Sequence, residues 1–193
     1  MVVIQDPFWI SGRAEAGPAP ATGRPYAVFP ASGAPDEPID AVAQAAALLA
    51  PHVDVVVTGK QPTRPDTPGL RLTGFIPYQE FQDLMTHAAV VLALTTREAT
   101  MQRAAYEGLQ LGRPLVCSDS KVLHRVLADG AVFVENTGHA IAAGITEAMA
   151  RGDELKAAGE AVKAAIRAEA ERGLAAVRAL AVSERYPAEP QRH

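Results

Sequence analysis

Residues 88–119 read AAVVLALTTREATMQRAAYEGLQLGRPLVCSD, and three segments of regular structure follow one another within them. Residues 90–94 are a short apolar run, typical of a strand buried on both faces. A helical pattern covers residues 100–111 and stops at Gly112-Arg113-Pro114, the glycine-then-proline signal of a helix end. A second buried run at residues 115–117 completes a β-α-β unit. Its polar residues gather at strand ends and at a helix N-terminus, where parallel sheets bind ligands and unpaired amides suit a phosphate.

The chain on both sides of this unit continues the alternation of apolar runs and helical patterns. Such alternation is typical of parallel strands with helices on both faces of the sheet. The sequence therefore predicts an α/β fold with a doubly wound, Rossmann-like, mostly parallel six-stranded sheet. Strands are expected at residues 26–29, 53–58, 70–73, 90–94, 115–117 and 131–134, and helices at residues 38–49, 78–88, 100–111, 121–127 and 139–149.

The two ends of the chain differ in composition from this central part. Residues 1–25 combine a short apolar start with a linker rich in glycine, proline and alanine that has no regular period. Residues 151–183 form a long helical pattern whose loose apolar stripe packs either on its own domain or on another domain or subunit. We therefore divide the chain into an N-terminal segment (1–25), a Rossmann-like domain (26–150) and a C-terminal helix with a frayed tail (151–193).

Composition and charge exclude several classes of function. The net charge is -4 and the lysines and arginines are dispersed, so the chain lacks the cationic face that nucleic acids attract. No apolar run approaches the roughly 20 residues that span a bilayer, and the N-terminus lacks signal-peptide features. A soluble, cytoplasmic protein is expected. The single cysteine, Cys117, lies in an apolar run and the histidines lack metal-ligand spacing, so we expect no metal site.

Three blocks of sequence are similar to a known family. They are LTGFIP at residues 72–77, AAVVL at residues 88–92, and EGLQLGRPLV at residues 107–116 followed by Ser118-Asp119. Residues 26–150 thereby resemble the C-terminal, nucleotide-sugar-binding domain of GT-B glycosyltransferases, in particular the retaining family 4 (glycosyl transferases group 1). The last block is the most specific, because it mirrors the family's Glu-Ala-x-x-x-Gly-x-Pro-Val-Val pattern at the same spacing. The resemblance implies half of a GT-B fold.

The resemblance also implies roles for individual residues. Glu107 matches the glutamate whose carboxylate accepts hydrogen bonds from both ribose hydroxyls. Phe75 and Ile76 match the loop whose backbone pairs with the nucleotide base. The family's other glutamate, which contacts the donor sugar, corresponds in position to Ala99, and here Glu98 lies one residue earlier. Glu98 reaches the sugar if it belongs to the loop, and its carboxylate points elsewhere if the helix includes it.

The first crossover loop departs from the family pattern. The family carries a basic residue and a Lys-Gly pair there, whereas residues 32–38 contain Asp36 and Glu37 and no cation. Negative charge that develops on a leaving diphosphate needs cations or helix amides to stabilise it. The candidate replacements are the side chains of Lys60, Arg97 and Arg103 and the backbone N–H groups of Ala99, Thr100 and Met101 at the expected helix start.

The leading hypothesis is the donor-binding half of a glycosyltransferase of the hexosyltransferase type. It takes its sugar from a nucleotide-diphosphate sugar, without a cofactor. GT-B enzymes act in a cleft between two Rossmann-like domains and only one fits in this chain, so a second half or subunit is expected to carry the acceptor site. The alternatives are a non-catalytic nucleotide-binding or assembly module with a degenerate GT-B domain and, more weakly, a GT-B-fold sugar epimerase. No catalytic residue is assigned.

Overall fold

The computed structural model describes Gly17, residues 23–62 and residues 65–185. The apolar start of the chain, most of the linker and the tail at residues 186–193 lie outside the described residues. The strands are β1 (Tyr26–Phe29), β2 (Asp54–Thr58), β3 (Leu70–Gly74), β4 (Val90–Ala93), β5 (Leu115–Ser118) and β6 (Val132–Val134). The helices are α1 (Ile39–Leu49), α2 (Tyr78–His87), α3 (Arg103–Gln110), α4 (Lys121–Leu127), α5 (Gly138–Ala150), α6 (Gly152–Arg185) and the short 3₁₀ helix η1 (Ala128–Gly130).

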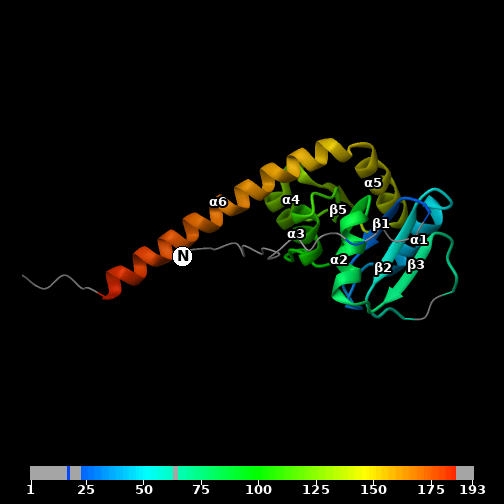
Figure 1. The fold of residues 1–193 in the computed structure, drawn as a ribbon, viewed down its shortest axis with the longest axis horizontal. Helices are drawn as coiled ribbons and strands as arrows, with labels where there is room; N and C mark the ends of the chain where they lie inside the picture. Colours follow the sequence, from blue (N-terminus) through cyan, green and yellow to red (C-terminus); the bar gives the residue numbers. More distant parts are fainter. Residues whose placement is uncertain (1–16, 18–22, 63–64, 186–193) are drawn as a thin grey trace, which may run out of the picture.

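The six strands of the described chain form one sheet with the order β3-β2-β1-β4-β5-β6 (Figure 1). All five strand pairs are parallel, which confirms the predicted fold class. The order runs outward in one direction from β1 to β3 and in the other from β4 to β6. The connections therefore reverse between β1 and β4, the place where doubly wound sheets open a crevice at their carboxyl edge.

Helices cover both faces of the sheet, because successive strand residues point to opposite sides. In β1, Ala27 and Phe29 face one core, and Tyr26 and Val28 face the other. The first core is closed by α1, α5 and Leu155 at the start of α6, and the second by α2, α3, α4 and the next turns of α6. Each large apolar side chain that is fully buried contributes about 1.5–3 kcal/mol relative to an exposed one. Packing in the two cores holds the strands in place, and with them the edge of the sheet at which their carboxyl ends lie.

Helix α3 begins three residues later than the sequence predicted. Residues 98–102 form a turn and extended backbone, with Gln102 at φ -76 and ψ 133, and the helix starts at Arg103. The polar groups of the preceding segment are bound elsewhere: the Thr96 N–H donates to the Asp36 carbonyl and the Arg97 N–H to the Thr95 hydroxyl. The expectation that the amides of residues 99–101 form the helix start is therefore wrong.

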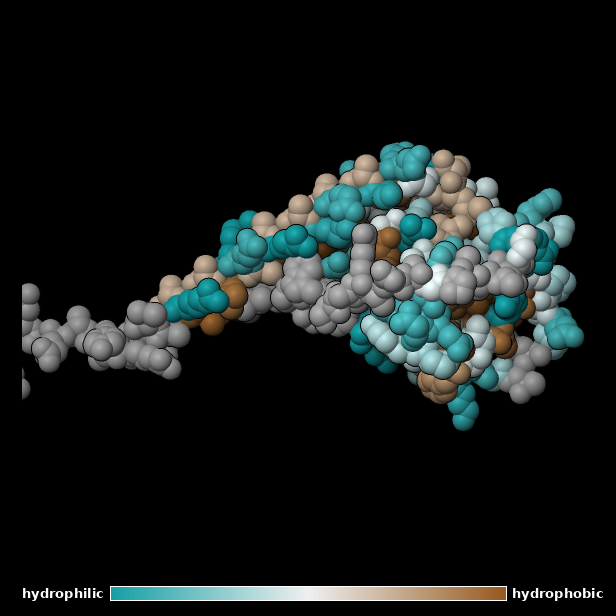
Figure 2. Space-filling model, in the orientation of Figure 1, coloured by the Kyte–Doolittle hydropathy of each residue, from teal (hydrophilic) through white to brown (hydrophobic). Residues whose placement is uncertain are grey.

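Helix α6 is 34 residues long, or about 51 Å at 1.5 Å per residue. Its first half packs on the domain through Leu155, Val162 and Ile166, which are buried. Its second half extends away from the domain (Figure 1) and carries exposed Leu174, Val177 and Leu180. Figure 2 shows apolar and polar surface alternating along this extension. Of the two expectations for the apolar stripe, packing on its own domain therefore holds for the first half only. Within the described part of the chain, no helix has the length and apolar character of a membrane span.

The close approach of α3 to the sheet depends on Gly108. A Cβ there would lie 2.4 Å from Cδ2 of Leu115 and 3.3 Å from Cβ of Val91. Alanine gains about 1 kcal/mol of helix propensity, whereas overpacking a core position costs about 1–3 kcal/mol. We expect Gly108→Ala to lower the free energy of unfolding by about 1 kcal/mol in urea denaturation.

Gly159→Ala provides the comparison, because a Cβ at that helical position meets only Cδ2 of Leu109 at 3.2 Å. It should destabilise the protein less than Gly108→Ala. A Gly108→Ala protein as stable as the wild type would contradict the packing of α3 described above.

Candidate functional site

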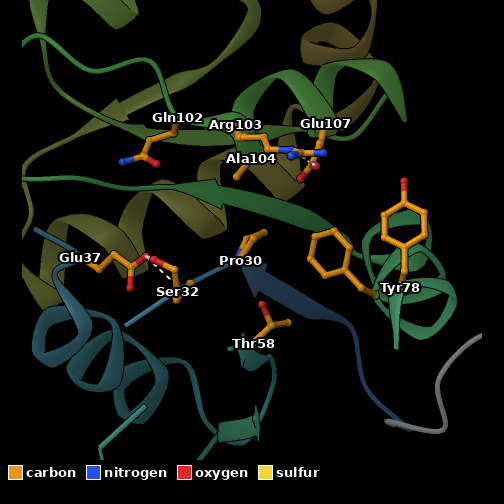
Figure 3. Close-up of a pocket in the computed structure, with 11 residues that line it drawn as sticks. Pro30, Ser32, Glu37, Thr58, Tyr78, Gln102, Arg103, Ala104 and Glu107 are labelled. Carbon is orange, nitrogen blue, oxygen red and sulfur yellow. Dashed lines mark hydrogen bonds and ion pairs between the residues drawn. The ribbon is translucent and has the colours of Figure 1, made fainter. Parts of the chain in front are cut away.

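A cavity of about 440 Å³ opens at the carboxyl edge of the sheet, where the connections reverse. We call it the switch-point crevice. Its volume lies in the range of small-molecule sites. The loops after β1 and β2 form one side of it, and α2 and α3 form the other (Figure 3). The lining residues are Pro30, Ala31, Ser32, Glu37, Thr58, Tyr78, Phe81, Gln102, Arg103, Ala104 and Glu107.

Glu107 is the buried carboxylate of this crevice. It lies on the second turn of α3 and is 7% exposed. Burial is the main cause that raises the pKa of Glu107 above its usual value, and the hydrogen bond and charge of Arg103 oppose it. A desolvated carboxylate beside a cavity has an energetic reason to accept hydrogen bonds from a ligand. Glu107 thus lies where a ligand in the crevice can reach it, and its contact with a ribose stays a prediction.

Arg103 is the cation nearest to Glu107 in this arrangement. Its Nε lies 2.8 Å from Oε1 of Glu107, one turn along the same helix (Figure 3). The Arg103 side chain is 66% exposed, so the guanidinium keeps contact with solvent while it lines the crevice. Of the nine residues that the sequence assigned to the site, Arg103 and Glu107 are the two that line the cavity.

The other seven assigned residues do not line it: Lys60, Phe75, Ile76, Glu98, Ala99, Thr100 and Met101. Glu98 does lie in the loop before α3, but its Oε1 accepts the Lys121 N–H at 2.9 Å, which caps the start of α4. Phe75 is 80% exposed, and Ile76 packs against the second core. Lys60 is exposed on the loop after β2.

The loops that follow β1 and β4 are bonded to each other beside the crevice. Oδ2 of Asp36 accepts the Thr95 hydroxyl at 2.7 Å, and the Asp36 carbonyl accepts the Thr96 N–H at 2.8 Å. The Thr95 hydrogen bond is the largest cause that lowers the pKa of Asp36. Arg97, expected as a phosphate-binding cation, lies with its Nε 3.5 Å from Oδ1 of Asp36. Arg97 therefore pairs with the acidic loop after β1 and helps to hold the loops after β1 and β4 together.

A buried hydrogen-bond ring joins the ends of β4, β5 and β6. The Ser118 hydroxyl accepts the Thr95 N–H at 2.9 Å and donates to the Asn136 side chain at 2.8 Å. The Asn136 amide in turn donates to the Thr95 carbonyl at 2.9 Å. Both Thr95 and Ser118 are nearly fully buried, so the ring satisfies polar groups that water does not reach. It holds the carboxyl edge of the sheet in register next to the crevice.

Sequence reasoning missed Ser32, Tyr78 and Gln102 as lining residues and noted Glu37 only for its charge. Nothing in the sequence near Tyr78 or Gln102 marks them. No pattern marked Glu37 either, because residue 34, three positions before it, is an alanine and not a capping serine or threonine. The Glu37 carboxylate accepts the Ala34 N–H at 3.1 Å.

The described residues contain no group of three or more histidine, cysteine, aspartate or glutamate side chains that could hold a metal ion. Cys117 is fully buried in β5, and burial raises the pKa of its thiol to about 12. The thiol stays protonated near neutral pH and behaves as a small apolar side chain.

The burial of Glu107 gives a pH dependence of stability. Its pKa is raised above the usual value for a glutamate, so the carboxyl group holds its proton more tightly in the folded protein than in the unfolded chain. The free energy of unfolding therefore falls as the pH rises from the usual pKa of a glutamate through the raised pKa of Glu107. We expect the melting temperature of Glu107→Gln, relative to the wild type, to increase between about pH 4 and about pH 7 in scanning fluorimetry.

Glu160→Gln on α6 is the control, because that carboxylate is exposed and pairs with Lys163. Its difference from the wild type should show less dependence on pH. A Glu107→Gln difference that is constant over the same range would contradict the desolvation of Glu107.

Comparison with known proteins identifies the family to which the chain belongs. Residues 24–152 match the family model described as glycosyl transferases group 1. No curated protein gives a significant sequence match. Among solved structures, sucrose-phosphate synthase from Thermosynechococcus elongatus has a TM-score of 0.67 at 18% identity, over 85% of this chain and 47% of that chain. Anabaena HepE in complex with UDP-glucose has a TM-score of 0.63 at 12% identity, over 81% of this chain and 49% of that chain.

Trehalose 6-phosphate synthase from Burkholderia multivorans has a TM-score of 0.62 at 14% identity, over 89% of this chain and 45% of that chain. At such identities the likeness concerns the fold. The chain spans about half the length of these proteins. The family match covers more than half of the chain and includes the whole sheet and the crevice. The chain therefore belongs to the glycosyl transferases group 1 family, and its fold is that of the C-terminal half of a GT-B glycosyltransferase.

Proposed function

We propose that this chain is the donor-binding half of a glycosyltransferase that takes a sugar from a nucleotide-diphosphate sugar. The observation that carries the proposal is Glu107, a 7% exposed carboxylate beside the crevice where the sheet connections reverse. A carboxylate offers two oxygens to a pair of neighbouring hydroxyls, such as those of a ribose. Anabaena HepE, which shares the fold, was solved with UDP-glucose, and this supports the same class of ligand here.

The start of α3 supplies the groups that favour a diphosphate. Gln102, Arg103 and Ala104 line the crevice, and no side chain caps this helix start. The amides at a helix start and the positive end of the helix dipole attract phosphate oxygens. The Arg103 guanidinium adds a positive charge beside them. These groups take the place that the sequence assigned to the amides of residues 99–101.

Two aromatic side chains give the crevice an apolar side. Tyr78 and Phe81, both on α2, line the crevice, and Tyr78 (Figure 3) is 62% exposed. Aromatic faces pack favourably on flat rings such as a nucleobase or on the apolar face of a sugar. The base would then lie near α2 and the diphosphate near the start of α3, with the ribose beside Glu107.

The acceptor site belongs, in this proposal, to a second domain or subunit. The chain spans about half of the length of the solved proteins that share its fold. No described side chain in the crevice has the environment of an activated nucleophile, so we assign no catalytic residue. Transfer would take place only when the partner half brings an acceptor to the donor sugar.

A second candidate is a non-catalytic nucleotide-binding or assembly module. Two observations favour it: Glu107 is already paired with Arg103, and the loop after β1 presents Glu37 to the crevice instead of a cation. In this case the domain has kept the fold and lost the affinity that transfer requires. The two candidates differ in whether nucleotide diphosphates bind, so one binding experiment separates them.

Isothermal titration calorimetry with UDP, ADP and GDP tests the proposed function. We expect micromolar binding of at least one nucleotide. Glu107→Ala should weaken it by about 10–100-fold, since a hydrogen bond to a charged group contributes about 1.5–3 kcal/mol.

Glu160→Ala is the matched control, because it removes a helical glutamate that also pairs with a cation, on α6. It should leave the affinity unchanged. If none of the three nucleotides binds the wild-type chain, the non-catalytic module becomes the better account. An equal loss of nucleotide affinity in Glu107→Ala and Glu160→Ala would show that Glu107 does not contact the nucleotide.

A further inference from the structure

The carboxylate of Glu37 is held by four hydrogen bonds from the loop just before it. Its Oε1 accepts the Ser32 N–H at 2.7 Å and the Ser32 hydroxyl at 2.8 Å. Its Oε2 accepts the Gly33 N–H at 2.8 Å and the Ala34 N–H at 3.1 Å. Three consecutive backbone N–H groups and one hydroxyl thus converge on a single anion. Successive amides that point into one concavity form an anion-binding nest.

The backbone of this nest is fixed by its surroundings. Gly33 has φ +83, and a Cβ at that position would lie 2.6 Å from the Lys60 carbonyl oxygen. The Glu37 N–H donates to the Ala34 carbonyl at 3.1 Å, and the Glu37 carbonyl accepts the Ile39 N–H at 2.8 Å. The main chain on both sides of the nest is therefore bonded. The part free to move is the Glu37 side chain, which rotates without disturbing those bonds.

The nest reaches the switch-point crevice at Ser32 and Glu37, whereas Gly33 and Ala34 do not line the cavity. Ser32 and Glu37 line the cavity together with Arg103 and Glu107 (Figure 3). An anion that enters the crevice meets donors already arranged around two oxygens, but a carboxylate occupies them. A second anion next to that carboxylate would be repelled by its negative charge.

We propose that the amides of residues 32–34 form a phosphate site, and that Glu37 is its internal occupant, which a phosphate group must displace. Glu37 is an autoinhibitory contact: its two oxygens satisfy the nest when no ligand is bound and compete with the ligand for the same donors. The apparent affinity for a phosphate then falls by the fraction of molecules in which Glu37 is in place. The identification of the phosphate as part of a nucleotide diphosphate rests on the proposed function.

Inorganic pyrophosphate is the direct probe, because it needs no base or ribose contact. We measure its affinity by calorimetry for the wild type, Glu37→Ala and Glu37→Gln. Glu37→Ala empties the nest and should tighten binding by about tenfold or more. Glu37→Gln should give a smaller gain, because its one carbonyl oxygen still accepts from the nest while its NH₂ group opposes the remaining donors.

Asp129→Asn is the charge-matched control. Asp129 is exposed in η1, at the amino end of β6 and thus at the opposite edge of the sheet. Its loss of one negative charge should change the affinity by less than about twofold. Should Glu37→Ala fail to fold by circular dichroism, Glu37→Gln carries the test, because it retains part of the loop bonding.

An affinity for pyrophosphate that is unchanged or weaker in the Glu37 variants would overturn the proposal and leave Glu37 as a structural cap. A gain equal to that of Asp129→Asn would also overturn it. The two proposals fail separately. If pyrophosphate binds more tightly to the Glu37 variants but no nucleotide binds, the phosphate site at residues 32–34 is supported and the donor-binding function is contradicted. If the wild type binds a nucleotide but the Glu37 substitutions do not change the affinity for pyrophosphate, the donor-binding function is supported and the role of Glu37 is contradicted.

Discussion

The divergence of the chain after β1 and β4 is the constraint on which the site depends. From β1 the chain passes to α1 on one face of the sheet, and from β4 it passes to α3 on the other. Two neighbouring parallel strands therefore send their loops apart, and a crevice is left between them at the carboxyl edge. Asp36 ties the two loops through Thr95 and Thr96, so the crevice keeps its shape without a ligand.

Within this crevice the protein satisfies its own polar groups. Glu107 pairs with Arg103, and Glu37 fills the amides of residues 32–34. A buried polar group without a partner costs about 1–3 kcal/mol, so the pairing of the buried Glu107 carboxylate stabilises the domain. In the proposed binding mode, a ligand that takes up the Glu107 carboxylate or the amides of residues 32–34 replaces hydrogen bonds that the protein already makes there. The binding free energy is then the difference between the contacts that the ligand makes and the internal contacts that it replaces. The hydrogen bonds of Glu37 in the acidic loop are part of those internal contacts.

The sequence was informative where a property depends on neighbouring residues. Buried parallel strands such as β4 appear as uninterrupted apolar runs, and Gly112 and Pro114 mark the end of α3, so fold class and element order were predicted correctly. The start of α3 was wrong by three residues, because the Thr96 N–H is bound to a loop 60 positions earlier in the chain. The contact of Glu98 with the start of α4 is equally long-range. The role of Glu37 depends on the positive φ of Gly33 and the resulting loop shape, which a residue pattern does not encode.

Nuclear magnetic resonance of the backbone amides, with a titration of UDP into the wild-type chain, tests most directly whether the crevice is the binding site. Amides report their own hydrogen bonds, so each wall is followed separately. The account predicts the largest chemical-shift changes at residues 32–34, at residues 103–107 and at Tyr78, with the outer half of α6 unaffected. Changes confined to surfaces outside the crevice, or no changes at saturating nucleotide, would contradict it.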